Sequence, residues 1–406
     1  MLCQFTVKNF QCLKNTVTFD MQATNITEHE QSLITDKDGE KFLPLGVIYG
    51  PNSSGKSTVL YALYSLVCKV MRPICAIGCD NQDCMKRSGN VYMKPFLFSK
   101  DTINQPTEFE LFFRTEKNEY QYIIAFQREK VLYEELYKKT ISGSRYSTLF
   151  RRENTVNIDL KNSLRNYNCD GISDNLPLLS FLGITHRRNA IIKDVINWFE
   201  NNFDYINYSN PREDSSIGVA KAGKIKSLVL KMMQEMDLGI SNYRTEEKED
   251  RLKVFTEHVV SNNKYELELF EESNGTIKVF GMLPHIANAL LSGSTLVIDE
   301  LDAKLHPMLL KYIIGLFSDP KVNKNGAQLI FTSHDLSTMN SDTFRRDEIW
   351  FIAKNEENAS SLYSLIEFKN DDGRPERKDA RYDKRYLEGR YGADPYLRRI
   401  IDWGEY

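Results

Sequence analysis

The chain has 406 residues, of which 41% are hydrophobic and 27% are charged, so it can form two or three compact units and is neither disordered nor fibrous. Its formal net charge of -3 gives no overall attraction to nucleic acid or to an anionic membrane. No apolar stretch approaches the roughly 20 residues that span a bilayer, and no signal peptide is recognisable. Seven scattered cysteines suit free thiols in a reducing compartment, so we expect a cytoplasmic protein.

Two antiparallel strands are predicted at the start of the chain. Apolar and polar residues alternate from Cys3 to Val7 and again from Val17 to Phe19, which is the period of a half-buried strand. A mostly polar stretch follows over residues 24–41. The apolar, β-branched run Leu45 to Tyr49 then predicts a buried strand.

This strand leads into a loop with the residues that bind phosphate. Its glycines let successive backbone N–H groups converge on one anion, and the helix predicted from Thr58 to Met71 directs its positive end to the same place. Lys56 can reach the β- and γ-phosphates of a bound nucleotide, and Ser57 can place its hydroxyl on Mg²⁺. The predicted nucleotide-binding residues are Gly50, Pro51, Asn52, Ser53, Ser54, Gly55, Lys56, Ser57 and Thr58.

The segment from Met71 to Val91 lacks periodicity and is predicted to be a loop. It contains Cys75, Cys79 and Cys84, which could hold zinc with one further ligand. No histidine lies nearby and the spacing matches no common zinc motif, so ordinary thiols are the alternative.

The following chain alternates between strand and helix patterns. We expect antiparallel strands at 109–113, 120–126 and 130–137, and strands again at 252–260 and 265–270. We expect helices at 177–182, 191–203 and 224–236, with a polar stretch at 205–222. The region 151–250 therefore looks like a helical insertion.

A second chemical element begins at the apolar run Leu296–Ile298, which ends in Asp299 and Glu300. Asp299 would bind the Mg²⁺ shell and Glu300 would polarise the attacking water. An ordinary strand end is the alternative for this pair alone. A third buried strand, 328–333, ends at His334.

The ordered set of the phosphate loop, Asp299-Glu300, Asp302 and His334 resembles the ATP-binding cassette (ABC) ATPase head of structural-maintenance and recombination-repair ATPases. Within that group the chain resembles the AAA-type ATPases of bacterial defence islands, including the ATPase of AbiL-like abortive-infection systems. The segments that carry this second resemblance are Pro95-Phe96, 272–276, 299–307, 346–351 and 386–392.

The resemblance implies an α/β fold, a P-loop NTPase of the ABC type with a mixed sheet, flanking helices, an antiparallel β subdomain and a helical insertion. The expected units are 1–150 and 251–370 for the two halves of the head, 151–250 for the insertion, and 371–406 for a charged, Tyr-rich tail. The implied cofactors are ATP and Mg²⁺.

The resemblance also implies that two copies enclose two nucleotides. Ser273 and Gly275 would then contact the γ-phosphate of the partner copy, with a hairpin turn as the alternative. Asp302 would lie at the dimer seam, or would cap a helix. His334 would contact the γ-phosphate in its own copy, or would be a core or surface histidine. Lys56, Glu300 and His334 are thus the predicted catalytic residues.

His306 and Gln105 are not counted among the predicted nucleotide-binding residues. His306 is expected to cap or pack a turn before Pro307. The glutamine that couples the γ-phosphate to the insertion in cassette heads has no secure place here, because Gln105 lies in a polar loop beside Pro106.

The tail from Asp371 to Tyr406 interleaves balanced charges with Tyr382, Tyr386, Tyr391, Tyr396 and Trp403. It could bind nucleic acid, dock a partner, or pack its tyrosines back on the head. No nuclease motif follows His334, so the resemblance implies a separate toxin or nuclease partner for an ATPase that acts as a homodimer or an oligomer of dimers. The alternatives are a DNA-repair ATPase and a scaffold that nucleotide locks without appreciable hydrolysis.

Overall fold

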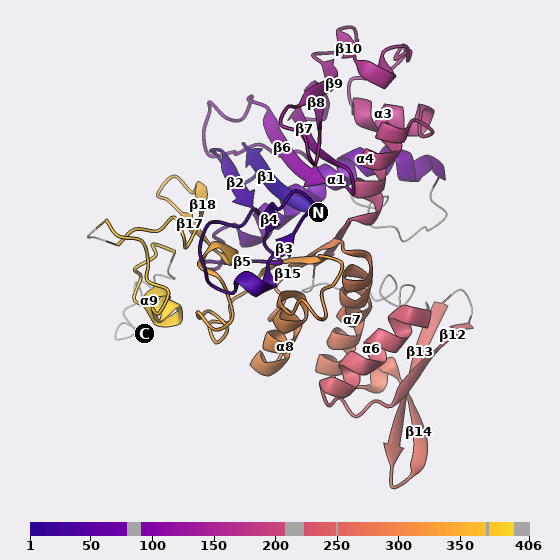
Figure 1. The fold of residues 1–406 in the computed structure, drawn as a ribbon, viewed down its shortest axis with the longest axis vertical. Coiled ribbons are helices and arrows are strands. Elements are labelled where there is room, and N and C mark those ends of the chain that lie inside the picture. Colours follow the sequence, from indigo (N-terminus) through magenta and orange to yellow (C-terminus); the bar gives the residue numbers. More distant parts are fainter. Residues whose placement is uncertain (79–90, 208–222, 249–250, 371–372, 394–406) are drawn as a thin grey trace, which may run out of the picture.

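The computed structural model describes residues 1–78, 91–207, 223–248, 251–370 and 373–393. These residues form an α/β fold in which two large sheets enclose one long helix and further helices cover the outer face of the central sheet (Figure 1). This confirms the predicted combination of a mixed sheet with an antiparallel β subdomain.

Within the described chain, seven strands form the antiparallel sheet. In spatial order they are β10 (Ile158–Leu160), β9 (Ser147–Arg152), β8 (Lys130–Thr140), β7 (Asn118–Gln127), β6 (Thr107–Arg114), β1 (Leu2–Lys8) and β2 (Val17–Asp20). The two opening strands pair antiparallel, as their alternation predicts. The three strands predicted between residues 109 and 137 are confirmed as β6, β7 and β8.

The central sheet contains six strands in the part of the chain that the structure describes. In spatial order they are β11 (Phe203–Asn207), β15 (Thr295–Asp299), β16 (Gln328–Thr332), β5 (Leu45–Tyr49), β17 (Ile349–Lys354) and β18 (Ser360–Ser364). All pairs are parallel except β17 with β18. Parallel strands end together, so the residues after β5, β15 and β16 meet at one edge of the sheet.

The central sheet separates two hydrophobic cores. Ile48, Val297 and Ile330 belong to the core that contains α1 (Lys56–Gly78) and the antiparallel sheet, whereas Val47 and Phe331 belong to the core on the other face. This division follows the two-residue period of a strand, and burial on both faces explains why these strands are continuously apolar.

Helix α1 fills the space between the two sheets, together with α3 (Leu178–Thr185) and α4 (Ala190–Asn201). It continues to Gly78, so the prediction of a loop from Met71 was wrong for residues 71–78. Ile74 lies in van der Waals range of Gly183 in α3, and this packing keeps the chain helical despite Pro73. Cys75 is buried in α1, whereas Cys79 and Cys84 lie outside the described residues.

By length and composition, Lys56–Ile77 could cross a membrane, contrary to the expectation that no stretch approaches that size. Most of this helix is buried inside the protein. A central helix enclosed by two sheets needs the same apolar composition, so the core position accounts for its sequence.

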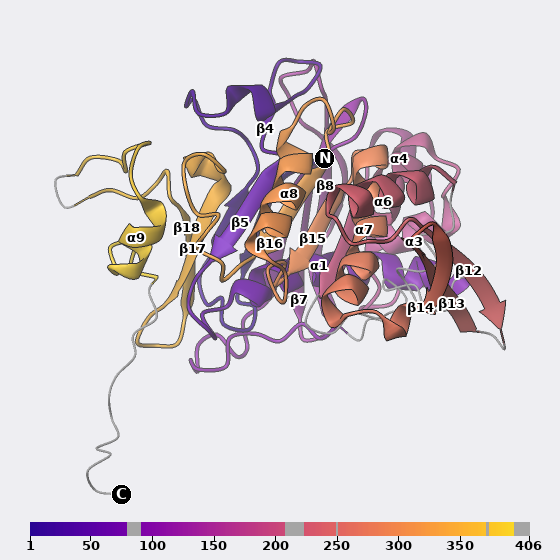
Figure 2. The same cartoon turned by 90° about the horizontal axis from the view of Figure 1, so that it is seen from below.

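The other face of the central sheet is covered by α6 (Gly223–Glu235), α7 (Asn274–Ser292) and α8 (Pro307–Ser318) (Figure 2). A small antiparallel sheet of β12 (Asn242–Lys248), β13 (Arg251–Val260) and β14 (Asn263–Glu268) projects beside α6. Short elements complete the chain: β3 (Ile34–Thr35), β4 (Lys41–Phe42), η1 (Glu30–Ser32), η2 (Asn162–Leu164), η3 (Leu269–Glu271), η4 (Arg346–Glu348) and α9 (Tyr382–Leu387).

The region 151–250 is less helical than predicted. Strands β9 and β10 extend the antiparallel sheet to Leu160, and β11 joins the central sheet beside β15. The helix expected to reach residue 203 ends at Asn201, and Phe203 and Tyr205 alternate with less buried residues as strand positions. Residues 208–222 of the expected polar stretch lie outside the described residues.

The described part of the tail packs on the head, which is one of its three predicted states. Tyr382, Tyr386 and Tyr391 are buried, and the last two rings stack on Phe351 at centroid distances of 5.6 and 4.9 Å. Tyr396 and Trp403 lie outside the described residues.

Candidate nucleotide-binding site

The phosphate loop joins the end of β5 to the start of α1, the context that its sequence requires. Gly55 has φ +106°, and a Cβ there would lie 2.6 Å from Sγ of Cys12. Both the backbone conformation and the close contact therefore require glycine at this position. Its carbonyl accepts hydrogen bonds from the amides of Thr58 and Val59 at 3.0 and 3.2 Å, which starts the helix immediately after the loop.

Lys56 is the buried cation of the site, with 6% of its surface exposed. Its ammonium donates to the carbonyl oxygens of Gly50 at 2.7 Å and Pro51 at 3.0 Å. Burial lowers the pKa of Lys56 to about 8, and the carboxylates of Asp299, Asp302 and Glu300 act in the opposite direction. The structure thus brings the predicted lysine into the electric field of all three predicted acidic residues.

The two carboxylates that follow β15 are held by the neighbouring strand β16. Thr332 Oγ1 donates to Asp299 Oδ1 at 2.7 Å and accepts from the Glu300 amide at 2.7 Å. Asp299 is 3% exposed. Glu300 has φ +58°, a left-handed conformation that turns the chain sharply at the end of the strand.

Asp302 and His334 lie in the loops that follow β15 and β16 and are joined by a hydrogen bond. The His334 amide donates to Asp302 Oδ2 at 3.0 Å, while Oδ1 of Asp302 is buried without a hydrogen-bond partner in the described structure. Partial burial and the nearby Lys56 ammonium lower the pKa of His334. The imidazole is therefore neutral at pH 7 and can donate one hydrogen bond.

Ser273 and Gly275 lie at the N-terminus of α7, where the sequence places them. Ser273 caps the helix by accepting from the Thr276 amide at 3.1 Å. A Cβ at Gly275 would meet no atom of the described residues closer than 3.7 Å, so packing against them does not require glycine there. Among the described residues, no hydrogen bond joins either residue to the phosphate loop of the same chain.

The remaining candidates lie outside this cluster. His306 caps α8, accepting from the Met308 amide at 3.2 Å, which confirms its predicted structural role. Gln105 is exposed in a polar loop, as predicted, where its amide donates to the Thr102 carbonyl.

Two residues of the site were not found from the sequence. The sequence predicts that Thr332 lies near the end of a buried strand, and a hydroxyl at such a strand end is the signal that could have indicated its role. Lys278, in the second turn of α7, lies close enough to Lys304 and Glu300 for their charges to act on it, and burial together with Lys304 lowers its pKa. Nothing in the local sequence indicated that α7 reaches the acidic pair.

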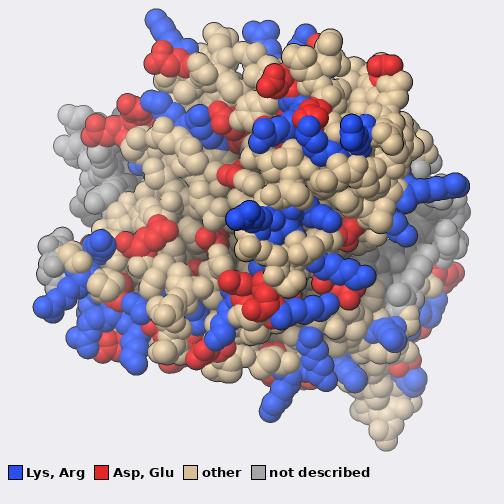
Figure 3. Space-filling model, turned by 45° about the horizontal axis from the view of Figure 1, so that its top comes forward, with Lys and Arg blue, Asp and Glu red and all other residues tan. Residues whose placement is uncertain are grey.

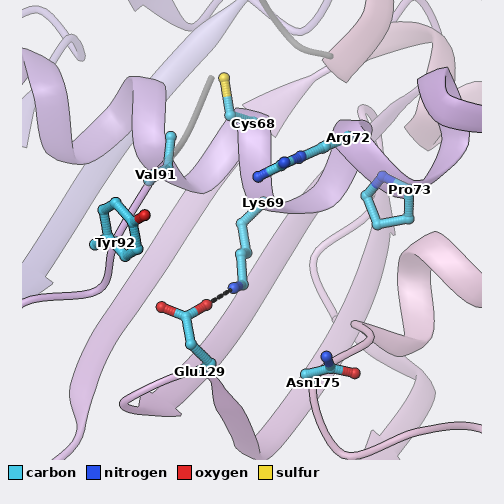
Figure 4. Close-up of a pocket in the computed structure, with 8 residues that line it drawn as sticks. All are labelled: Cys68, Lys69, Arg72, Pro73, Val91, Tyr92, Glu129 and Asn175. Atoms are coloured by element: carbon cyan, nitrogen blue, oxygen red, sulfur yellow. Dashed lines mark hydrogen bonds and ion pairs between the residues drawn. The ribbon is translucent and has the colours of Figure 1, made fainter. Parts of the chain in front are cut away.

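A separate pocket of about 350 Å³ lies beside later turns of α1 (Figure 4). Lys69 projects from α1 into this pocket and forms an ion pair with Glu129. The pocket therefore lies along α1, the helix that follows the phosphate loop. None of the residues that line the pocket belongs to that loop.

The site fits Mg²⁺ bound together with a nucleotide. Asp299 supplies a buried carboxylate, and none of the described residues donates to its Oδ2. Ser57 is exposed at the first turn of α1. One carboxylate and one hydroxyl are a typical protein contribution to Mg²⁺, which takes its other oxygen ligands from phosphates and water. The described residues contain no group of three or more His, Cys, Asp or Glu residues suited to a protein-only metal site.

This arrangement defines the class of protein. The phosphate-loop strand β5 is separated from the acidic strand β15 by β16, and His334 lies two residues after β16 ends. An antiparallel sheet packs over α1. The fold is that of a P-loop ATPase of the ABC type.

The family can also be named. Residues 45–340 match the family model described as "AAA domain, putative AbiEii toxin, Type IV TA system", and the chain belongs to this family. No curated protein sequence matches the chain.

Solved structures similar to the chain include heads of SMC proteins. An SMC head domain from Thermotoga maritima has a TM-score of 0.41 at 13% identity and covers 89% of this chain and 98% of its own. An SMC head bound to the C-terminal winged-helix domain of ScpA has a TM-score of 0.45 at 12% identity, covering 89% and 97%. The SMC head from Pyrococcus furiosus with an extended coiled coil and a ScpA domain has a TM-score of 0.38 at 12% identity, covering 89% and 96%.

Proposed function

We propose that the protein binds ATP with Mg²⁺ and hydrolyses it to ADP and phosphate. The observation that carries the proposal is that Lys56, Asp299, Glu300 and His334 lie at the adjacent ends of three parallel strands. The carboxylates of Asp299 and Glu300 act on the Lys56 ammonium, which in turn lowers the pKa of His334, as expected for side chains that surround one triphosphate.

Each side chain has a role that its surroundings support. Lys56 and the loop amides would bind the β- and γ-phosphates, and Ser57 with Asp299 would hold Mg²⁺, which neutralises phosphate charge when bound. Glu300 would orient the attacking water and accept its proton. His334, neutral at pH 7, would donate a hydrogen bond to the γ-phosphate.

Phosphate release by wild type and Glu300→Gln tests the proposal. We expect the substitution to lower kcat by roughly 100-fold or more, the range for loss of a general base, while ATP binding persists. Glu116→Gln removes an exposed carboxylate from a remote turn and is the matched control. Equal phosphate release by wild type and Glu300→Gln, with ATP still bound, would support the scaffold alternative instead.

We also infer that two copies close around nucleotide, with Ser273 and Gly275 facing the partner's phosphate loop. The free space at Gly275 supports this assignment, because no contact with the part of the chain that the structure describes explains a glycine there. Light scattering should show ATP-dependent association of Glu300→Gln, and Gly275→Asp in the same background should abolish it. Gly315→Asp, at another uncrowded helical glycine, should leave association intact.

The family description, which refers to the AbiEii toxin and to type IV toxin–antitoxin systems, supports a regulatory role. We propose that the protein is the cytoplasmic ATPase subunit of an abortive-infection defence system, resembling AbiL-like systems, and that ATP-driven closure controls a separate toxin or nuclease. Phage plating on its native host should show protection with the wild-type gene and none with Glu300→Gln.

The DNA-repair alternative would require a basic surface. Figure 3 shows Lys and Arg side chains interleaved with Asp and Glu on the face that it presents. Salt-sensitive DNA binding that changes with ATP would favour this alternative over the defence role.

A further inference from the structure

The side chain of Thr332 forms hydrogen bonds to both Asp299 and Glu300, the two acidic residues on which the proposed function depends. Thr332 is the last residue of β16 and is fully buried. Its hydroxyl accepts from the Glu300 amide at 2.7 Å and donates to Asp299 Oδ1 at 2.7 Å. A hydroxyl has one proton to donate, and the amide already occupies an acceptor position, so the proton must point to the Asp299 carboxylate.

These two bonds constrain the site in two ways. The bond to Oδ1 limits rotation of the Asp299 carboxylate and so fixes the position of Oδ2, to which none of the described residues donates. The bond from the amide holds Glu300 in its left-handed conformation, which residues other than glycine rarely adopt. The Thr332 carbonyl also accepts from the Leu301 amide at 3.2 Å, so one residue binds three consecutive residues of the acidic segment.

We infer that Thr332 is a positioning residue that aligns Asp299 for Mg²⁺ and Glu300 for water. The inference rests on the proposed ATPase function and adds to it a determinant outside the phosphate loop and the acidic pair. Serine can form the same two side-chain hydrogen bonds. Valine has nearly the shape of threonine but can form neither bond. Thr332→Val therefore tests the contribution of the hydroxyl while side-chain packing stays nearly the same.

The chain offers a matched control at the opposite end of the same sheet. Thr295 is fully buried at the start of β15 and donates to Gln328 Oε1 at 3.1 Å. Thr295→Val therefore removes a buried hydroxyl from the neighbouring strand, far along the sheet from the acidic pair. Any general effect of losing such a group should be the same in Thr295→Val and Thr332→Val.

The first measurement uses no nucleotide. Amide hydrogen exchange, resolved by mass spectrometry at Glu300, should accelerate at least about tenfold in Thr332→Val because its acceptor is gone. Thr332→Ser and Thr295→Val should match wild type. Exchange at Glu300 that is unchanged in Thr332→Val would overturn the inference.

The second measurement concerns magnesium. In Thr332→Val, the Mg²⁺ concentration that half-saturates binding of a non-hydrolysable ATP analogue should rise about tenfold, the lower range for loss of an outer partner of a metal ligand. Binding of the analogue in EDTA should not change. Under saturating Mg²⁺ and ATP, kcat should fall about 10-fold to 100-fold with KM for ATP within about threefold. An unchanged Mg²⁺ requirement in Thr332→Val would overturn the inference.

The design separates this inference from the proposed function. If wild type releases no more phosphate than Glu300→Gln, the ATPase proposal fails, while hydrogen exchange and Mg²⁺-dependent binding still decide the role of Thr332. If wild type is active and Thr332→Val behaves as Thr295→Val does, the inference fails alone. Should Thr332→Val not fold, Thr332→Cys provides the same comparison with a much weaker donor.

Discussion

The His334 amide donates a 3.0 Å hydrogen bond to Oδ2 of Asp302, which links the loops that follow β16 and β15. The other oxygen of this carboxylate is buried with no partner among the described residues. Asp302, together with Asp299 and Glu300, also acts electrostatically on the Lys56 ammonium. If His334 contacts the γ-phosphate as proposed, a change there would reach the Asp302 loop through this one hydrogen bond.

Removing this link should slow hydrolysis more than it weakens binding. Asp302→Ala should lower kcat about tenfold, as for loss of an outer partner in a site, because His334 is no longer held. Asp302→Asn keeps an acceptor oxygen and should retain more of the activity. Steady-state kinetics with ATP checks both variants. Equal kcat values for Asp302→Ala and wild type would show that the link has no role in turnover.

Gly55 should tolerate no side chain. Gly55→Ala forces a positive φ and a 2.6 Å contact with Cys12 Sγ, and we expect a loss of about 2 kcal/mol in the free energy of unfolding together with a loss of ATP binding. Adding Cys12→Ala should recover the steric part only. Gly315→Ala, at an uncrowded position inside α8, should instead stabilise by up to about 1 kcal/mol. Urea unfolding measures these stabilities. A Gly55→Ala variant with the same free energy of unfolding as wild type would contradict the prediction.

Much of this site could be predicted because its chemistry is local in sequence. Lys56 lies in a loop bracketed by glycines, and Asp299, Glu300 and His334 each follow an apolar run that predicts a buried strand. The role of Thr332 depends instead on the register between β15 and β16, whose partners are more than thirty residues apart. Such pairings are not encoded in any short segment.

The errors in the fold have a similar cause. Pro73, Cys75 and Gly78 suggest the end of a helix, but packing of α1 between the sheets and against α3 overrides these local preferences. Strand β11 has only five residues, too few for its alternation to stand out beside the helix before it. The pairing of β11 with β15 supplies the stabilisation that its sequence does not reveal.

His285 should make stability depend on pH. Burial of its imidazole opposes protonation, but the Asp204 carboxylate, 2.5 Å from Nδ1, outweighs burial and raises the pKa of His285 above its usual value. A raised pKa in the folded state means that the pair stabilises fully below the unfolded value of about 6.5. This stabilisation is lost as the pH rises through the folded-state pKa.

His285→Gln should therefore cost about 1.5–3 kcal/mol at pH 6, as for a hydrogen bond to a charged group, and less at higher pH. The coupling between His285 and Asp204 can be measured by urea unfolding at pH 6 and at higher pH. The proteins to compare are wild type, His285→Gln, Asp204→Asn and the double variant. The two single substitutions should each flatten the pH profile. Parallel pH profiles for wild type and His285→Gln would contradict the assignment.

The tail should contribute to the stability of the head. Tyr391 stacks on Phe351 and donates to Glu376 Oε2 at 2.9 Å, and that carboxylate is 1% exposed. Tyr391→Phe should cost about 1–2 kcal/mol through the lost hydrogen bond, and Tyr391→Ala about 3–5 kcal/mol through the lost ring. Leu387→Ala, at an exposed side chain of the same segment, should lie within about 0.5 kcal/mol of wild type. Thermal unfolding checks this ranking, and a Tyr391→Ala variant as stable as Leu387→Ala would show that the tail contributes no stability.

Calorimetric titration of Glu300→Gln with ATP in magnesium buffer tests most directly whether these separated segments form one nucleotide site. We predict saturable binding at one site per chain, at least about 30-fold weaker after Lys56→Ala, a loss of about 2 kcal/mol, and weaker without Mg²⁺. Absence of ATP binding by the folded protein, or equal affinity with and without Lys56, would contradict the assignment.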